Sequence, residues 1–316
     1  MRYIGDLLTQ VRERSHNQEY TIGSGTSSIE DVVEGVGNQQ LIEFVNEGQT
    51  HIQSAIINAH PVEFVVSKEI NIVPNQEEYS IPDNVFVNNR LVSVQYTSTG
   101  NAIDYYRLPP RPLRDRFTDI TSHPSWYIRR SGKILLNPIP TTGVGKIRVE
   151  YYREADRLAL RAGKISAITD NGTISALTVG TSDDLPNLIS NIGDKYLCIC
   201  DKDGNVKEYN VAYTSYNDGT GVFSGISHTR TGAETITTDD YITVGKYTTT
   251  HSVLPINCER FLISYGTLMA LKLDSSADWQ DELAVMQSIK ADIIDSFGDM
   301  DEDVKDFPVL DSEILF

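Results

Sequence analysis

Histidine and cysteine, the residue types that most often bind metals or act as bases and nucleophiles, are few and scattered in this chain. The six histidines form no HExxH pattern or other close ligand spacing; they are His16, His51, His60, His123, His228 and His251. Cys198 and Cys200 are separated by one residue, which on a β-strand places both thiols on one face. Zinc would need further ligands from distant segments, so we interpret both thiols as small buried hydrophobic groups. The sequence predicts no metal site.

Carboxylates and glycine loops give no firmer catalytic pattern. Asp201, Asp203 and Asn205 resemble the start of a calcium loop, but Gly204 falls at the fourth position and no glutamate stands at the twelfth, so a hairpin turn is the better interpretation. Nucleophile-elbow, Walker and dinucleotide-binding motifs are absent from the sequence. A glycosidase stays open, since its two carboxylates can come from distant positions. We predict a protein that is not an enzyme and has no cofactor.

Charge and composition exclude further classes. The 316 residues include 27 Lys and Arg against 44 Asp and Glu, a net charge of −17 with a pI near 4.7. Such a charge opposes gripping nucleic acid or anionic lipid through an outer surface. No apolar run approaches the ~20 residues of a membrane span, and the first residues do not resemble a signal peptide. Three cysteines, an odd number, are expected to be free thiols of a reducing compartment.

One basic cluster stands out against this acidic background. It comprises Arg107, Arg111, Arg114, Arg116, Arg129 and Arg130. These side chains either form ion pairs with the chain's own carboxylates or meet an acidic partner, for example an acidic region of another copy. Because the two signs are strongly segregated, we favour the partner interpretation and select Arg111, Arg114 and Arg116 as candidate partner-binding residues.

The last residues combine acids with large apolar groups. Many acidic tails stay disordered, but exposing these apolar side chains to water is unfavourable, so ordering on a partner is the alternative. The candidate partner-binding residues here are Phe307, Val309, Leu310, Ile314, Leu315 and Phe316.

Helices are predicted at both ends of the chain. Residues 39–59 repeat apolar side chains at steps of three and four, which predicts an amphipathic helix of about six turns. Gly48 costs about 1 kcal/mol in mid-helix relative to alanine, so we expect a second helix to approach it closely. Apolar stripes at 261–273 and 279–297 supply that partner, and residues 2–14 form a further short helix.

β-Structure fills the middle of the chain. Strands alternate with turns from residue 63 to 152, with a hairpin turn at Ser131-Gly132 and a short helix at 111–120. From 163 to 250, short strands recur between turns at Asn171-Gly172, Asp203-Gly204 and Asp218-Gly219, which is typical of a small antiparallel barrel or sandwich.

These elements predict an α+β fold with three parts. The first is an antiparallel helical bundle core with β-hairpins, formed by residues 1–160 and 251–297. The second is an inserted all-β domain, a small barrel or sandwich, at 161–250. The third is an acidic and apolar C-terminal arm at 298–316.

Several segments resemble a known family. LIEFVNEGQTHIQ is similar to the first helix of the head–tail adaptors of tailed bacteriophages of the podovirus kind. EEYSIPDNV followed by RLVSVQY resembles that family's Y-x-LP segment and next strand, and SWYIRRSGKILLNPIP followed by IRVEYYREADRL resembles its hairpin. The resemblance covers residues 38–158 and 253–297. Residues 163–250 have no counterpart in the short adaptors.

The resemblance implies a structural virion protein of the neck or tail, assembled in the host cytoplasm. It would form a ring, usually of twelve copies, that binds the portal protein above and a further tail or ring protein below. DNA would pass through its channel without specific binding, and residues 299–316 would be the portal-binding arm. The alternative function is a virion protein that binds a glycan or receptor through the tyrosine-bearing 161–250 domain.

Overall fold

The computed structural model describes residues 3–15, 38–86, 91–101, 103–116, 120–121, 123–180, 189, 193–274, 276 and 278–305, with backbone alone for 120–121 and 298–305. Contacts divide the chain into two compact units. Unit 1 comprises Met1–Ala59 and Ala155–Phe316, and unit 2 comprises His60–Glu154. Unit 2 is thus inserted in the sequence of unit 1, and each unit is described by itself. The fold contains both helices and sheets and is α+β, as predicted.

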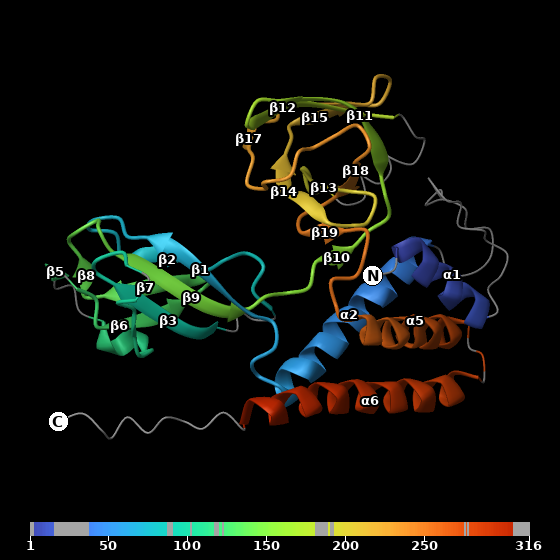
Figure 1. Cartoon of the computed structure of the whole chain (residues 1–316), viewed down its shortest axis with the longest axis horizontal. Coiled ribbons are helices and arrows are strands. Elements are labelled where there is room, and N and C mark those ends of the chain that lie inside the picture. Colours follow the sequence, from blue (N-terminus) through green and yellow to red (C-terminus); the bar gives the residue numbers. More distant parts are fainter. Residues whose placement is uncertain are drawn as a thin grey trace. The chain divides into compact units, whose positions relative to one another are not determined.

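Unit 1 gathers helices from both ends of the chain (Figure 1). They are α1 (Ile4–Arg14), α2 (Asn38–Ala59), α5 (Glu259–Leu273) and α6 (Trp279–Lys305), with the 3-10 turn η2 (Ile256–Cys258) before α5. Helix α5 packs against both α1 and α2. A Cβ atom at Gly266 would lie 3.0 Å from Val11 of α1 and 3.4 Å from Val45 of α2. At Gly48 it would lie 3.0 Å from the Tyr265 ring, so the predicted close approach of a second helix is confirmed.

The strands of unit 1 follow unit 2 in the sequence. They are β10 (Arg157–Leu158), β11 (Gly163–Asp170), β12 (Thr173–Val179), β13 (Tyr196–Cys200), β14 (Val206–Ala212), β15 (Ser215–Asn217), β16 (Val222–Ser224), β17 (His228–Thr229), β18 (Tyr241–Val244) and β19 (Thr248–Thr249). Most form one antiparallel sheet in the order β14-β13-β18-β11-β12-β16-β15 around a core that includes Leu177, Ile199 and Phe223. Among the described strands none joins β14 to β15, so no closed barrel is formed and the predicted barrel is not confirmed.

Three amide side chains of α2 fasten the segment that opens this β-structure. Asn46 accepts from the backbone N–H of Leu158 (2.7 Å) and donates to its carbonyl (3.0 Å). Gln49 donates to the carbonyl of Asp156 (2.8 Å), and Gln53 accepts from the N–H of Ala155 (3.1 Å). Spacings of three and four place the three amides, here called the amide seam, on one side of the helix. They supply backbone partners where the chain returns from unit 2.

The start of α1 is attached to the same β-structure. The N–H of Ile4 donates to the carbonyl of Thr250 (2.9 Å), and Tyr3 forms a β-bridge with His251. Arg161 stacks between the rings of Tyr3 and Tyr241, at 4.7 and 4.3 Å from their centroids. Helices and strands of unit 1 therefore share contacts at both ends of the β-segment, which is why they form one unit. The predicted boundaries at 161–250 and 298–316 stay predictions; α6 itself continues to Lys305.

Unit 2 is built from β-strands. They are β1 (Val65–Asn71), β2 (Glu78–Ser80), β3 (Leu91–Thr97), β4 (Tyr106–Arg107), β5 (Ile120–Thr121), β6 (Trp126–Arg130), β7 (Lys133–Asn137), β8 (Ile139–Pro140) and β9 (Lys146–Tyr152). They form sheets β1-β9-β3-β4, β2-β7-β6 and β5-β8 around a core that includes Tyr96, Ile134 and Val149. The predicted hairpin turn is confirmed, with positive φ at both Ser131 and Gly132.

The predicted helix at 111–120 is wrong. Among the described residues of this range, 111–116 and 120, the only helical turn is the 3-10 turn η1 (Leu113–Asp115), and the segment before it runs in an extended conformation beside β6. Pro109, Pro110 and Pro112 lack N–H groups and favour extended neighbours. The N–H of Arg111 instead donates to the carbonyl of Tyr127 at 2.8 Å. Pairing with a strand therefore prevails over the apolar spacing that suggested a helix.

Replacing Gln49 with Met tests the amide seam. The variant keeps the length of the side chain but removes the bond to the buried carbonyl of Asp156 and the bond to Ser252. We expect the free energy of unfolding in urea to fall by about 1–3 kcal/mol, because buried polar groups lose partners. The control is Gln40→Met, which alters an exposed glutamine of the same helix. Equal losses in the two variants would contradict a special role for the seam.

Candidate partner-binding surfaces

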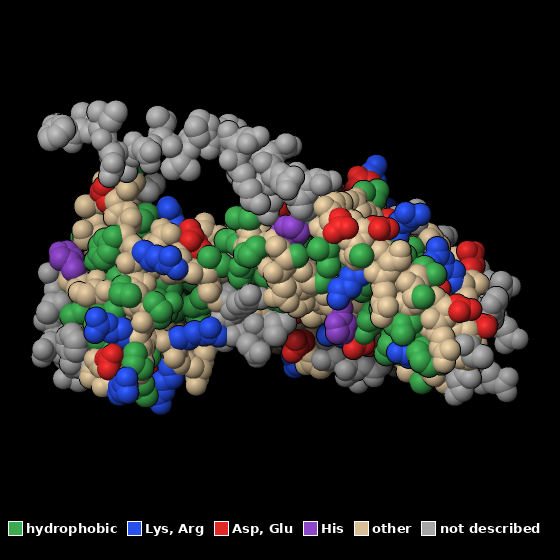
Figure 2. Space-filling model, turned by 90° about the horizontal axis from the view of Figure 1, so that it is seen from below, with side chains coloured by type: hydrophobic (Ala, Val, Ile, Leu, Met, Phe, Trp, Pro, Cys, Tyr) green, Lys and Arg blue, Asp and Glu red, His purple; other side chains and the backbone are tan. Residues whose placement is uncertain are grey.

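Charge is distributed unevenly between the two units. Unit 2 carries 12 Lys and Arg against 10 Asp and Glu, a net charge of +2, while the rest of the chain carries 15 against 34, or −19. Figure 2 shows Lys and Arg side chains gathered on the face of unit 2 that the view presents, at its left. The basic cluster found in the sequence lies entirely within this unit, which is therefore the part of the chain suited to an acidic partner.

Arg116 is occupied by its own unit. Its Nε and Nη2 atoms donate to both carboxylate oxygens of Glu77, at 2.8 and 2.7 Å. Hydrogen bonding to Glu77 raises the pKa of Arg116. Beside this pair, Lys133 binds Glu78, and this hydrogen bond lowers the pKa of Glu78. Arg116 therefore forms an ion pair within unit 2, in agreement with the alternative in which the cluster pairs with the chain's own carboxylates.

Arg111 and Arg114 present a different environment. The guanidinium of Arg111 lies 5.6 Å from the ring centroid of Trp126, in cation–π range. The side chain of Arg114 is 86% exposed, and its contact with Asp115 is long, at 3.7 Å. Leu113, next to it on η1, is 50% exposed. An exposed cation beside an exposed leucine is a combination suited to an acidic and apolar partner.

Two further arginines lie near Tyr127, the strand neighbour of Arg111. Burial raises the pKa of Tyr127, while the positive charges of Arg129 and Arg107 act in the opposite direction. We use the name arginine surface for the exposed set Arg107, Arg111, Arg114 and Arg129 with Tyr106 and Leu113. The candidates in 307–316 lie outside the described residues.

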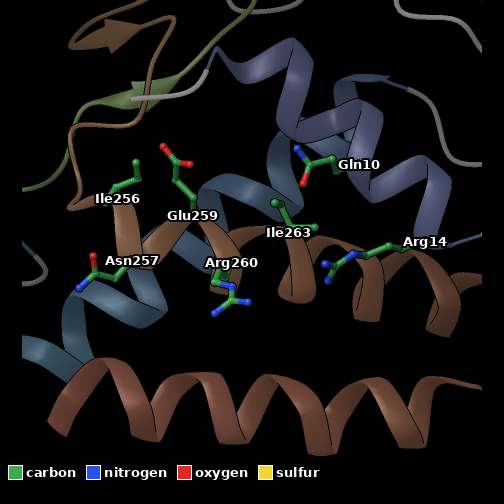
Figure 3. Close-up of a pocket in the computed structure, with 7 residues that line it drawn as sticks. All are labelled: Gln10, Arg14, Ile256, Asn257, Glu259, Arg260 and Ile263. Carbon is green, nitrogen blue, oxygen red and sulfur yellow. The ribbon is translucent and has the colours of Figure 1, made fainter. Parts of the chain in front are cut away.

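A groove runs between α1 and α5 in unit 1 (Figure 3). Its volume is about 550 Å³, and it is lined by Gln10, Arg14, Ile256, Asn257, Glu259, Arg260 and Ile263. Ile256 is 67% exposed, and Arg14 and Arg260 are also exposed. The groove thus combines two exposed cations and the buried carboxylate of Glu259 with apolar side chains. Nothing in the sequence pattern marked it, because its residues come from helices that are distant in the chain.

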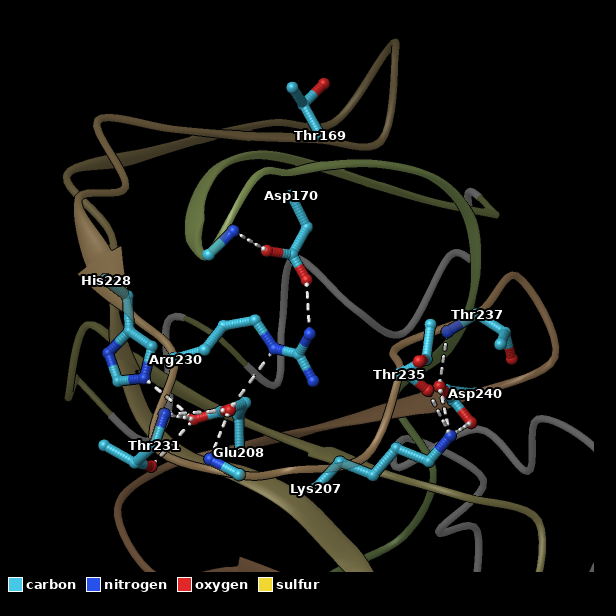
Figure 4. A network of polar contacts seen from close by, with 12 residues as sticks. Thr169, Asp170, Lys207, Glu208, His228, Arg230, Thr231, Thr235, Thr237 and Asp240 are labelled. Carbon is cyan, nitrogen blue, oxygen red and sulfur yellow. Dashed lines mark hydrogen bonds and ion pairs between the residues drawn. The ribbon is translucent and has the colours of Figure 1, made fainter.

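A buried carboxylate fastens the loop after β17 to β14 (Figure 4). Glu208 accepts hydrogen bonds from the N–H groups of Thr231 (3.0 Å) and Gly232 (2.8 Å) and from the Thr231 hydroxyl (2.9 Å). The Nε2 atom of His228 lies 3.2 Å away, and Arg230 binds Asp170 at 3.2 Å. Burial acts to raise the pKa of Glu208, but these hydrogen bonds outweigh it and hold the pKa below its usual value. The chain's own donors occupy this carboxylate, so its role is structural.

The thiols and the Asp201 turn behave as the sequence predicted. Cys198 and Cys200 are both fully buried on β13. Burial raises the pKa of Cys200 and of Cys258 to about 12, so neither is a reactive thiolate at neutral pH. Asp201 accepts from the N–H groups of Asp203 and Asn205, at 2.8 and 2.9 Å, which confirms the hairpin turn.

The described part of the chain contains neither a metal-binding cluster nor a membrane-spanning helix. Its His, Cys, Asp and Glu residues form no group of three or more that could hold a metal ion. None of its helices is long and apolar enough to cross a membrane.

The comparison with protein families gives a clear result. The model of the family described as SU10 adaptor protein matches residues 2–199. The chain belongs to this family. Its members are head–tail adaptors of bacteriophages, which are structural proteins of the virion. No curated protein matches the chain. The adaptor family predicted from the sequence is therefore confirmed.

The family match covers only part of the structure described above. It includes α2 with the amide seam and the whole of unit 2, and it ends within β13. Helices α5 and α6 lie beyond it. The segment NEGQ of α2, part of the resemblance, begins with Asn46 and ends with Gln49, so two of its four residues belong to the seam. The sequence signal for the seam is this recurrence of amides along one side of an apolar stripe.

Glu208 predicts a pH dependence of stability. Because its folded pKa is lower than its unfolded value of about 4.3, its contribution is present above that pH and is lost as pH falls through the folded pKa. We expect Glu208→Gln to lower the free energy of unfolding at pH 7 by about 1–3 kcal/mol, and the gap to narrow below about pH 4. Denaturant titration across pH tests this, with Glu234→Gln, at an exposed glutamate, as control. A gap that is independent of pH would contradict it.

Substitutions of Arg114 and Arg116 should affect stability differently, because Arg114 is exposed and Arg116 is bonded to Glu77. Arg116→Gln breaks the two bonds to Glu77, so we expect the thermal midpoint to fall. Arg114→Gln removes an exposed charge and should leave the midpoint unchanged. Differential scanning fluorimetry compares the two variants directly. A larger loss for Arg114→Gln would show that our division of the cluster is wrong.

Proposed function

We propose that the chain is one subunit of a ring, of twelve copies, that joins the portal protein to the tail of a bacteriophage and extends the channel for DNA. The observation that carries this proposal is the family match over residues 2–199. In this proposal a helical bundle core forms the ring, and the strands at 161–250 project from the ring as an additional domain. The ring assembles in the host cytoplasm and becomes part of the virion neck.

The net charge of the chain supports a channel through which DNA slides. Residues outside unit 2 carry a net charge of −19. A wall of that sign repels the phosphates, whereas a basic wall would hold DNA through release of counterions. DNA then passes without specific binding, and the acidic composition is a functional property of the ring.

The arginine surface supplies a contact between copies. Copies around a ring meet through two different surfaces of the same chain. A basic surface on unit 2 and an acidic remainder provide two such surfaces of opposite sign. Arg111 and Arg114 make this contact, and Arg116 supports it by fixing the segment through Glu77. Because the charges are exposed, assembly weakens as salt rises.

Residues 299–316 act as the portal-binding arm. After the last residue of α6 the arm contains acids but no Lys or Arg, together with the six apolar candidates Phe307, Val309, Leu310, Ile314, Leu315 and Phe316. Burial of these side chains on the portal offsets the entropy lost when the segment orders. A further tail or ring protein binds the opposite side of the ring.

Removing residues 306–316 tests the arm. The truncation leaves α6 complete, so we expect an unchanged thermal midpoint but loss of binding to the portal protein of the same phage in pull-down and native mass measurements. The matched control is a chain in which the same eleven residues are placed in scrambled order. If the truncated chain still bound the portal with the affinity of the full chain, the arm assignment would be wrong. Binding by the scrambled control would show that charge alone, without sequence, makes the contact.

A further inference from the structure

The groove between α1 and α5 has the chemistry of a peptide-binding site. Its apolar part is formed by Ile263, which is buried, and Ile256, which is 67% exposed. The guanidinium groups of Arg14 and Arg260 are exposed, and neither forms an ion pair within the described part of the chain. A segment that alternates carboxylates with large apolar side chains would match both features.

The segment at 306–316 has this composition. It contains Asp306, Asp311 and Glu313 and no Lys or Arg, and its last three residues are Ile314, Leu315 and Phe316. In this segment a run of large apolar residues directly follows the acids. Leaving apolar side chains of this kind in water costs about 25 cal/mol per Å² of apolar surface.

The position of α6 brings this segment within reach. Helices α5 and α6 contact each other and run in opposite directions, joined by a short connection (Figure 1). The 27 residues of α6 are longer than the 15 of α5 by roughly 18 Å. Helix α6 therefore ends beyond the N-terminal end of α5, which is the end that lines the groove. Eleven extended residues span up to about 36 Å, enough to return to it.

We propose that, in the free protein, residues 306–316 fold back into the α1–α5 groove of their own chain and leave it when the portal binds. The cations of the groove bind the carboxylates of the segment, and the groove's apolar side chains bind the Ile-Leu-Phe end. A tethered segment experiences an effective concentration in the millimolar range, which favours its own groove over that of another copy. This inference deepens the proposed role of the arm and rests on it for the release step.

The consequence is a subunit that does not expose its apolar arm before it meets the portal. Portal binding and groove binding use the same side chains, so they exclude each other. The portal site must therefore offer the arm a more favourable environment than the groove, and the groove reduces the apparent portal affinity by the fraction of arms that it holds.

Disulfide trapping tests the contact in the full chain without any portal, so its outcome is separate from that of the truncation. The test variant combines Ile256→Cys with Leu315→Cys, and the control combines Leu273→Cys, at the other end of α5, with Leu315→Cys. The native cysteines are buried and stay in both. With oxidised glutathione at low protein concentration we expect the intrachain disulfide to form about tenfold faster in the test variant. Equal rates, or disulfides mainly between chains, would overturn the proposal.

Charge reversal identifies the groove as the site. Arg14→Glu with Arg260→Glu should slow trapping about tenfold, and adding Asp311→Arg with Glu313→Arg should restore it. Arg114→Glu, on the arginine surface, is the matched control and should leave the rate unchanged. If Arg114→Glu slowed trapping and the groove reversal did not, the arm would bind the arginine surface and the proposal would be wrong.

Discussion

The hydrogen bonds between α2 and residues 155–158 are the interaction on which the rest of the structure depends. The chain enters unit 2 after α2 and returns to unit 1 at Ala155. The amide seam binds the backbone at this point of return. Buried N–H and carbonyl groups need partners, and a helix cannot supply them from its own backbone. Asn46, Gln49 and Gln53 supply them from side chains instead. Gln49 and Gln53 are almost fully buried, so their polarity serves this contact rather than contact with water.

This constraint links the two halves of the chain. Beyond the seam, β10 pairs with β19 in parallel, and the chain after β19 leads into α5. Gln49 also binds Ser252, in the segment between β19 and α5. One side of α2 therefore fixes the start and the end of the β-segment, while its glycine and apolar residues receive α5. The NEGQ segment of α2 therefore contributes to both contacts, through Asn46 and Gln49 on one side and Gly48 on the other.

Much of this arrangement followed from sequence, and the exceptions have physical causes. The long helix, the partner of Gly48 and the Ser131-Gly132 turn were predictable because each depends on local spacing or on one special backbone position. Over the described residues 111–116 the expected helix does not form because Pro112, the two prolines before Arg111 and the edge of β6 favour extended pairing, which spacing alone does not reveal. The ion pair of Arg116 with Glu77 joins residues far apart in sequence and could not be separated from the exposed Arg114 before the fold was known.

We propose that the chain forms a ring on a portal. The most direct measurement is native mass spectrometry of the particles obtained when this chain is expressed together with the portal protein of its phage. The account predicts a complex in which twelve copies of this 35.2 kDa chain are bound to the portal ring. A portal ring that carries no copies, while the chain remains folded and monomeric beside it, would contradict the account.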